Sequence, residues 1–157
     1  MIRLLTGLAE PTTGKIALFG ESNKKLAKQR ERIGCIIESP SLYLDMTAHE
    51  NLEVQRLQRG IPGKVCIDNA LELVNLRDAG KKKAKDFSLG MRQRLALAIA
   101  LLGNPEFLVL DEPINGLDPT GIIELRNLLK RLNKERGITI LISSHILTEL
   151  HQLANRY

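Results

Sequence analysis

Hydrophobic and polar residues follow two different spacings along this chain, and each spacing predicts a different kind of element. Runs that are apolar at nearly every position are typical of strands buried on both faces of a parallel sheet. Such runs predict strands over residues 15–19, 33–37, 107–110 and 138–142. Apolar residues three or four positions apart, together with capping residues, predict helices. These helices cover residues 1–8, 24–32, 47–59, 65–76, 88–102, 145–157 and a segment that begins at Asp118.

Strands in alternation with helices predict an α/β fold with a parallel sheet. The middle of the chain interrupts this alternation, because residues 47–102 contain helical patterns only. We therefore expect a helical subdomain over residues 47–102, inserted into an α/β core of residues 1–46 and 103–157. Thr47 followed by Glu50 predicts a capping box at its first helix. Ligands of open parallel sheets bind outside the carboxyl ends of the strands, and the polar residues collect at those ends here.

The apolar run that begins at Phe107 ends in two adjacent carboxylates, Asp111 and Glu112. Adjacent carboxylates repel each other, so their pairing indicates a cation or an acid–base role that offsets the repulsion. An Asp at the end of a buried strand is typical of a residue that holds Mg²⁺ near a nucleotide phosphate. The Glu that follows can polarise an attacking water molecule. A solvent-exposed turn is the alternative interpretation of the same residues.

Two further polar segments fit this chemistry when they are considered beside the carboxylates. The last predicted strand is followed by Ser143, Ser144 and His145, and an imidazole at this edge can contact a terminal phosphate or position a water molecule. Ser88 and Gly90 begin a helix whose free N–H groups form an anion site. Taken alone, the histidine is more often incidental, and the start of the helix is more often a solvated basic surface.

Composition and charge narrow the classes of protein further. The 157 residues are 43% hydrophobic and 26% charged, which argues against disorder and against a pure coiled coil. The net charge is +5, and the segment from Lys81 to Arg94 alone carries six Lys or Arg and one Asp. We therefore expect a local anionic partner and no nucleic acid. Cys35 and Cys66 lie in apolar stretches without metal-ligand spacing, which predicts buried free thiols. The longest apolar run, Leu95–Leu102, is shorter than the roughly 18 residues of a membrane span.

The polar segments occur in one continuous order along the chain. The run FSLGMRQRLALAIALLGNPEFLVLDEPINGLDP is followed by ITILISSH. In this order they resemble the ATP-binding subunits of ABC transporters, and the resemblance covers the whole chain. Residues 88–91 match the signature motif, residues 107–112 the Walker B strand, residues 116–118 the D-loop, and His145 the switch histidine. The resemblance implies a parallel sheet like that of P-loop NTPases.

The resemblance also implies a role for each of these segments. ATP with Mg²⁺ would lie between two ATP-binding subunits arranged head to tail. Ser88–Met91 would bind the nucleotide held by the partner subunit, with Ser88 and Gly90 at its γ-phosphate. Asp111 would bind Mg²⁺ through water, and Glu112 would act as the general base. His145 would sense the γ-phosphate, and Asp118 would communicate across the nucleotide-bound dimer.

Two departures from the family pattern indicate a branch. The usual signature is LSGGQ, and here Leu89 and Met91 replace its first Gly and its Gln. Glu38 stands where most members have the Q-loop Gln, and its carboxylate could bind Mg²⁺ or water beside ATP. These features resemble the bacitracin-export and lantibiotic-immunity branch, which implies export of a peptide antibiotic or another amphiphile. We expect a cytoplasmic subunit, peripheral on the inner face of the plasma membrane, that contacts a membrane-spanning permease through residues Glu38–Met46.

No G-x-x-x-x-G-K-[ST] segment, the loop that cradles phosphates, occurs in the 157 residues. The opening MIRLLTGL resembles the helix that follows that loop. We therefore expect an incomplete sheet in a nucleotide-binding domain truncated at both ends, which binds ATP weakly or not at all by itself. Two alternatives stay open. One is a non-hydrolysing fragment that pairs with an intact subunit, and the other is a non-transport ABC ATPase of chromosome maintenance or the ribosome.

Overall fold

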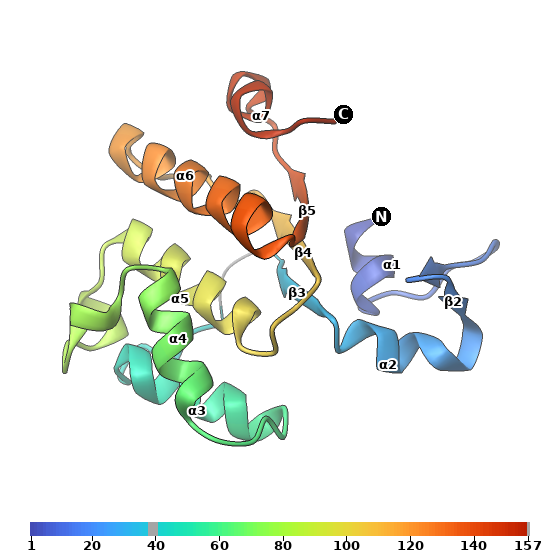
Figure 1. Ribbon diagram of the computed structural model, residues 1–157. Coiled ribbons are helices and arrows are strands. Elements are labelled where there is room, and N and C mark those ends of the chain that lie inside the picture. Colours follow the sequence, from blue (N-terminus) through green and yellow to red (C-terminus); the bar gives the residue numbers. More distant parts are fainter. Residues whose placement is uncertain (38–40, 157) are drawn as a thin grey trace.

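A three-stranded parallel sheet forms the centre of the molecule in the computed structural model, which describes residues 1–37 and 41–156 (Figure 1). The strands are β3 (Ile33–Ile36), β4 (Phe107–Asp111) and β5 (Thr139–Ser143), in the order β3-β4-β5. Phe107 pairs with Ile33 on one side and with Thr139 on the other. The three strands are therefore aligned, and their carboxyl ends lie at one edge of the sheet. The predicted α/β fold with a parallel sheet is confirmed.

Seven α-helices are described around this sheet, with three short 3₁₀ helices between them. The α-helices are α1 (Ile2–Thr6), α2 (Leu26–Arg30), α3 (Ala48–Gln58), α4 (Val65–Leu73), α5 (Leu89–Leu101), α6 (Pro119–Arg136) and α7 (Leu147–Leu153). The 3₁₀ helices are η1 (Asn23–Lys25), η2 (Arg77–Ala79) and η3 (Ala84–Asp86). Within residues 1–37 and 41–156, no helix combines the length and the apolar character needed to cross a membrane.

The middle strand is the most deeply buried, since Leu108, Val109 and Leu110 expose 1% of their surface or less. Helix α5 packs directly against β3. A Cβ atom at Gly34 would lie 2.4 Å from the carbonyl oxygen of Ala100, so only glycine permits this approach. A long apolar stripe on α6, formed by Leu125, Leu128, Leu129 and Leu132, completes the core.

Helices α3, α4 and α5 pack together around fully buried side chains that include Leu52, Ile67 and Leu95. The capping box predicted for the first of these helices is present. The Thr47 hydroxyl accepts a hydrogen bond from the Glu50 N–H at 3.2 Å, and the Glu50 carboxylate accepts one from the Thr47 N–H at 2.8 Å. Figure 1 shows α3 and α4 on one side of the sheet and the N-terminal elements α1 and α2 on the other.

The structure differs from the sequence prediction in the N-terminal segment. The strand predicted over residues 15–19 is only two residues long, β1 (Ala17–Leu18), and it does not join the parallel sheet. It pairs antiparallel with β2 (Glu21–Ser22). Phe19 and Gly20 between them both have positive φ angles, 51° and 79°. Two such residues form the tight turn of a hairpin, which returns the chain before it can reach the sheet.

The cysteines also differ in part from the prediction. Both are free thiols, as expected, but Cys35 is exposed and Cys66 is only half-buried. Residues of β3 point alternately to opposite faces, and the buried positions are Gly34 and Ile36. Cys35 therefore points to the other face of an outer strand, where little covers it.

Candidate nucleotide site at the strand ends

Carboxylate and hydroxyl side chains meet where β4 and β5 end. The register of the two strands places Asp111 beside Ser143. The Ser143 hydroxyl donates a hydrogen bond to the half-buried Asp111 carboxylate, and this donor fixes the orientation of the carboxylate. The sequence places both residues at strand ends but assigns no role to Ser143. Their shared position directly after the two predicted strands is the signal that could have paired them.

Glu112 and His145, the two residues predicted to be catalytic, are in direct contact. The His145 Nδ1 atom lies 2.9 Å from the Glu112 Oε2 atom. His145 lies in the loop between β5 and α7, because the helix predicted to begin there begins only at Leu147. The Ser144 hydroxyl accepts a hydrogen bond from the Ile146 N–H at 3.1 Å in this loop. A carboxylate held beside an imidazole can accept a proton from a bound water molecule.

Each of the two adjacent carboxylates has its own partner in the chain, Ser143 for Asp111 and His145 for Glu112. These contacts reduce the repulsion that the sequence predicts between the carboxylates. The backbone of Glu112 has a φ of 49°, and its N–H donates to the Ser143 carbonyl at 3.0 Å. A positive φ outside glycine is uncommon and is often found at functional sites. We call Asp111, Glu112, Ser143 and His145 the strand-end cluster.

A second group of predicted residues gathers where α5 and α6 begin. Ser88 caps α5, and its hydroxyl accepts a hydrogen bond from the Met91 N–H at 3.2 Å. Asp118 caps α6 by accepting from the Gly121 N–H at 3.2 Å. The two helix starts are neighbours, because a Cβ atom at Gly116 would lie 3.1 Å from a methyl group of Leu89. We call residues 88–91 and 116–118 the helix-start cluster.

The side chains of the two clusters have different partners. In the part of the chain that is described, no hydrogen bond or ion pair joins a side chain of the strand-end cluster to one of the helix-start cluster. Ser88 and Asp118 are exposed, and the Leu89 side chain is 47% exposed. The helix-start cluster is therefore accessible from outside the molecule. Glu38, the remaining predicted site residue, lies outside the described residues.

Several basic side chains of the segment from Lys81 to Arg94 form hydrogen bonds or ion pairs with other residues of the chain. The Lys85 ammonium donates to the Asp45 carboxylate at 2.9 Å, and this hydrogen bond lowers the pKa of that carboxyl group. Arg92 donates to two backbone carbonyls, and Arg94 lies 3.7 Å from a carboxylate oxygen of Glu124. Half of the six basic residues thus have partners within the chain. The carboxylates of Asp45 and Glu124 offset part of the positive charge that this segment presents to an external anion.

The side chains of the strand-end cluster could bind magnesium together with a nucleotide, but they do not form a metal site from protein ligands alone. Within the described ranges, no group of three or more His, Cys, Asp or Glu residues is placed to hold a metal. Magnesium usually takes one or two carboxylates and completes its shell with water and substrate phosphates. Asp111, oriented by Ser143, supplies a hard oxygen ligand of that kind.

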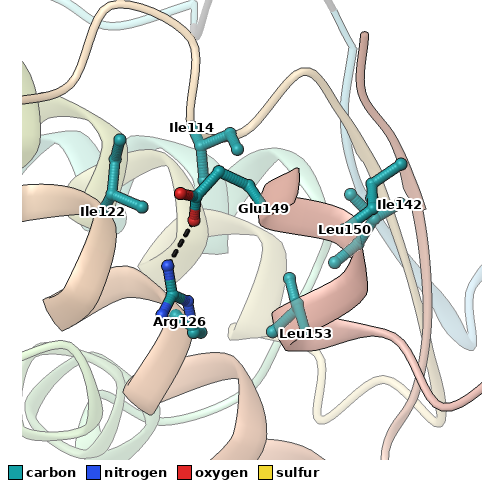
Figure 2. A pocket seen from close by; sticks show the side chains of 7 residues that line it. All are labelled: Ile114, Ile122, Arg126, Ile142, Glu149, Leu150 and Leu153. Atoms are coloured by element: carbon teal, nitrogen blue, oxygen red, sulfur yellow. Dashed lines mark hydrogen bonds and ion pairs between the residues drawn. The ribbon is translucent and has the colours of Figure 1, made fainter. Parts of the chain in front are cut away.

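Helix α7, which follows His145, is fastened to α6 by charged side chains. The Arg126 guanidinium donates to the carboxylate of Glu149 and to the side chain of Gln152. Figure 2 shows the Arg126 and Glu149 groups facing each other beside apolar residues of both helices. The cavity between them has a volume of about 10 Å³, no more than one water molecule requires. This place is a packing contact between α6 and α7.

A larger cavity, of about 230 Å³, lies away from both clusters. It is bounded by β3, α3 and α5 and includes Cys35, Gln55 and Arg59. None of the described residues that line it belongs to the strand-end or the helix-start cluster. The candidate functional residues therefore lie at the carboxyl ends of the strands and at the starts of α5 and α6, outside this cavity.

Comparison with known proteins identifies relatives of this chain. The family model described as ABC transporter matches residues 1–115. The chain is 53% identical over 155 residues to the bacitracin transport ATP-binding protein BcrA of Bacillus licheniformis, covering 98% of this chain and 51% of that protein. It is 42% identical over 155 residues to the lantibiotic transport ATP-binding protein SrtF of Streptococcus pyogenes, covering 99% of this chain and 66% of that protein.

The fold of the chain is also similar to solved structures. A dimeric ATP-binding cassette in a post-hydrolysis state, bound to ADP and Pi, superposes with a TM-score of 0.81 at 25% identity. The superposition covers 97% of this chain and 71% of that one. The chain spans about half the length of the bacitracin relative that it matches.

Proposed function

The chain belongs to the ABC transporter family, and from this premise we propose that it is the ATP-binding and ATP-hydrolysing part of an exporter subunit. The contact of 2.9 Å between Glu112 and His145 carries this proposal, because it places a proton acceptor and an imidazole at the predicted site. The transported compound in the proposal is a peptide antibiotic or a similar amphiphile. Its support is the likeness to proteins named for bacitracin and lantibiotic transport.

In the proposed mechanism each residue of the strand-end cluster has one task. Asp111, oriented by Ser143, would hold Mg²⁺ through water when ATP is bound. When bound, this ion offsets the negative charge of the phosphates. Glu112 accepts a proton from the attacking water molecule. His145 orients the Glu112 carboxylate through its Nδ1 atom and contacts the γ-phosphate.

The helix-start cluster acts, in this proposal, on ATP held by a second ATP-binding subunit. Its exposure, and side-chain partners that differ from those of the strand-end cluster, support a head-to-tail pair. Ser88 and Gly90 then face the γ-phosphate across the interface, flanked by Leu89 and Met91. Asp118 lies beside them and communicates between the two ATP sites. A dimeric cassette with ADP and Pi among the structural relatives supports the same arrangement.

We assign the permease contact to residues Glu38–Met46, on the inner face of the plasma membrane. Glu38 is also proposed to bind Mg²⁺ or water beside ATP. We also propose that the chain divides into an α/β core, residues 1–46 and 103–157, and a helical subdomain, residues 47–102. Exposed Tyr43 and Leu44, at 45% and 46%, support the contact, since they give this segment an apolar surface.

The proposal is tested with the native complex that contains this chain, by its Mg²⁺-dependent ATP turnover with and without added peptide. We expect bacitracin-type or lantibiotic-type peptides to raise the turnover, and linear hydrophilic peptides of equal length to have no effect. Two results together would indicate a non-transport ATPase. The turnover of the complex would be the same with and without amphiphilic peptides, and cells that produce the complex would gain no resistance to those peptides. Absence of turnover would favour a non-hydrolysing fragment.

A further inference from the structure

One peptide group in the basic segment is held from two directions. This group joins Ala84 to Lys85. The Lys85 N–H donates to the Leu44 carbonyl at 2.8 Å, and the Ala84 carbonyl accepts from Arg92 Nε at 3.2 Å. Arg92 Nη2 donates in addition to the Lys85 carbonyl at 2.7 Å. The peptide group therefore links the segment after β3 to the first turn of α5.

The segment on the far side of this link, residues 43–47, is held firmly to α3. Asn51 of α3 is 1% exposed, and its side-chain amide contacts the segment with both of its ends. Its oxygen accepts from the Tyr43 N–H at 2.8 Å. Its nitrogen donates to the carbonyls of Tyr43 and Thr47 at 3.0 and 2.9 Å. A buried amide satisfied in this way fixes the segment in one conformation.

The near side of the link is the cap of α5. The Arg92 N–H donates to the Ser88 carbonyl at 3.0 Å, so the guanidinium and the cap residue belong to the same helical turn. Ala84 is fully buried, and Phe87 is 4% exposed, which anchors the link between them. The Arg92 side chain therefore connects residues 84–85 to the helical turn that contains Ser88.

We infer that Arg92 is a positioning residue that passes the position of residues 43–47 to Ser88 and Gly90. The inference rests on the proposed function, since it takes the permease contact and the role of Ser88 from it. The guanidinium acts through its planar fork, because it donates to two consecutive carbonyls at once. Lysine retains the charge but has no such fork, so it cannot replace arginine here.

Amide hydrogen exchange of the wild-type chain and of Arg92→Lys tests this inference without any need for ATP turnover. We expect Arg92→Lys to raise the exchange rates of the Lys85 and Met91 amides about tenfold, since hydrogen bonds of a charged group are lost. The matched control is Arg131→Lys, which removes a guanidinium bond to the Leu73 carbonyl at 2.8 Å. It should leave the Met91 amide unchanged. Slow exchange of Leu108–Leu110 in β4 confirms that each variant is folded.

A double-mutant cycle with Asn51→Ala separates this coupling from a general loss of stability. Asn51 and Arg92 do not share a hydrogen bond, so independent effects on the Met91 amide would add. We expect the double variant to exchange no faster at Met91 than the faster single variant. An unchanged Met91 amide in Arg92→Lys, or additive effects in the cycle, would overturn the inference. The expected exchange in a native complex without ATP turnover would instead overturn the proposed function.

Discussion

Glu112 combines a proposed catalytic carboxylate with a backbone conformation that few side chains adopt. Its φ of 49° is held in place by the hydrogen bond from its N–H to the Ser143 carbonyl at 3.0 Å. The same residue directs its carboxylate to His145. Strain at such a position persists only where the surrounding structure enforces it, and here the enforcing strand is β5.

We predict that Glu112→Gly is more stable than Glu112→Ala by about 1 kcal/mol, because only glycine adopts this backbone conformation without strain. Both variants lack the carboxylate, so the pair isolates the backbone contribution. The measurement is the free energy of unfolding from urea denaturation. Equal stability of the two variants would show that the position is unstrained.

For Glu112 and His145, the sequence predicts which residues belong to the site but not that they are in contact. The sequence identifies both residues from their positions after apolar strands, because carboxyl ends of parallel strands meet at one edge. It does not specify their separation, since that depends on the register of β4 and β5 and on the delayed start of α7. The Ser143 hydrogen bond to Asp111 was missed for the same reason.

At the scale of elements, each cluster is next to one of two helices, α6 and α7, that contact each other. Helix α6 begins at Asp118 in the helix-start cluster, and α7 follows His145 in the strand-end cluster. Arg126 connects them through Glu149 and Gln152. The side chains of Arg126 and Glu149 are only 17% and 22% exposed, so this pair is better shielded than a surface ion pair.

We predict that Arg126→Gln lowers the free energy of unfolding by about 1–3 kcal/mol, because hydrogen bonds of a charged group are lost in a partly buried place. Arg136→Gln, at the exposed end of the same helix, is the control and should change it by less than about 0.5 kcal/mol. Denaturant unfolding of both variants is the measurement. A similar effect of the two substitutions would show that the α6–α7 contact contributes little.

Long periodic elements were predictable from the sequence, and short ones were not. Helices α3, α5 and α6 begin after Thr47, Ser88 and Asp118, as the capping residues indicate. The hairpin of β1 and β2 depends on the positive φ angle of Phe19, which residue type does not reveal. Local propensity therefore determined the elements with strong caps, and tertiary context determined the others.

At the scale of the whole molecule, the order of the strands explains why the proposed chemistry is concentrated. Strand β4 lies between β3 and β5, so Asp111 and Glu112 reach the centre of the sheet edge, and His145 reaches them from the neighbouring strand. The helix-start cluster is exposed, and its side chains have other partners. This division supports a site that needs a second subunit. The sequence predicted the members of both clusters except Ser143, but not the contacts among these residues.

The steady-state ATP turnover of the native complex carrying Glu112→Gln tests the proposed role of the strand-end cluster most directly. We predict a loss of about 100-fold or more, since the proton acceptor is removed while the shape of the side chain is kept. Glu135→Gln, an exposed substitution on α6, is the matched control and should retain the wild-type rate. ATP binding should persist in both variants. Wild-type turnover in Glu112→Gln would contradict the assignment of Glu112 as the general base.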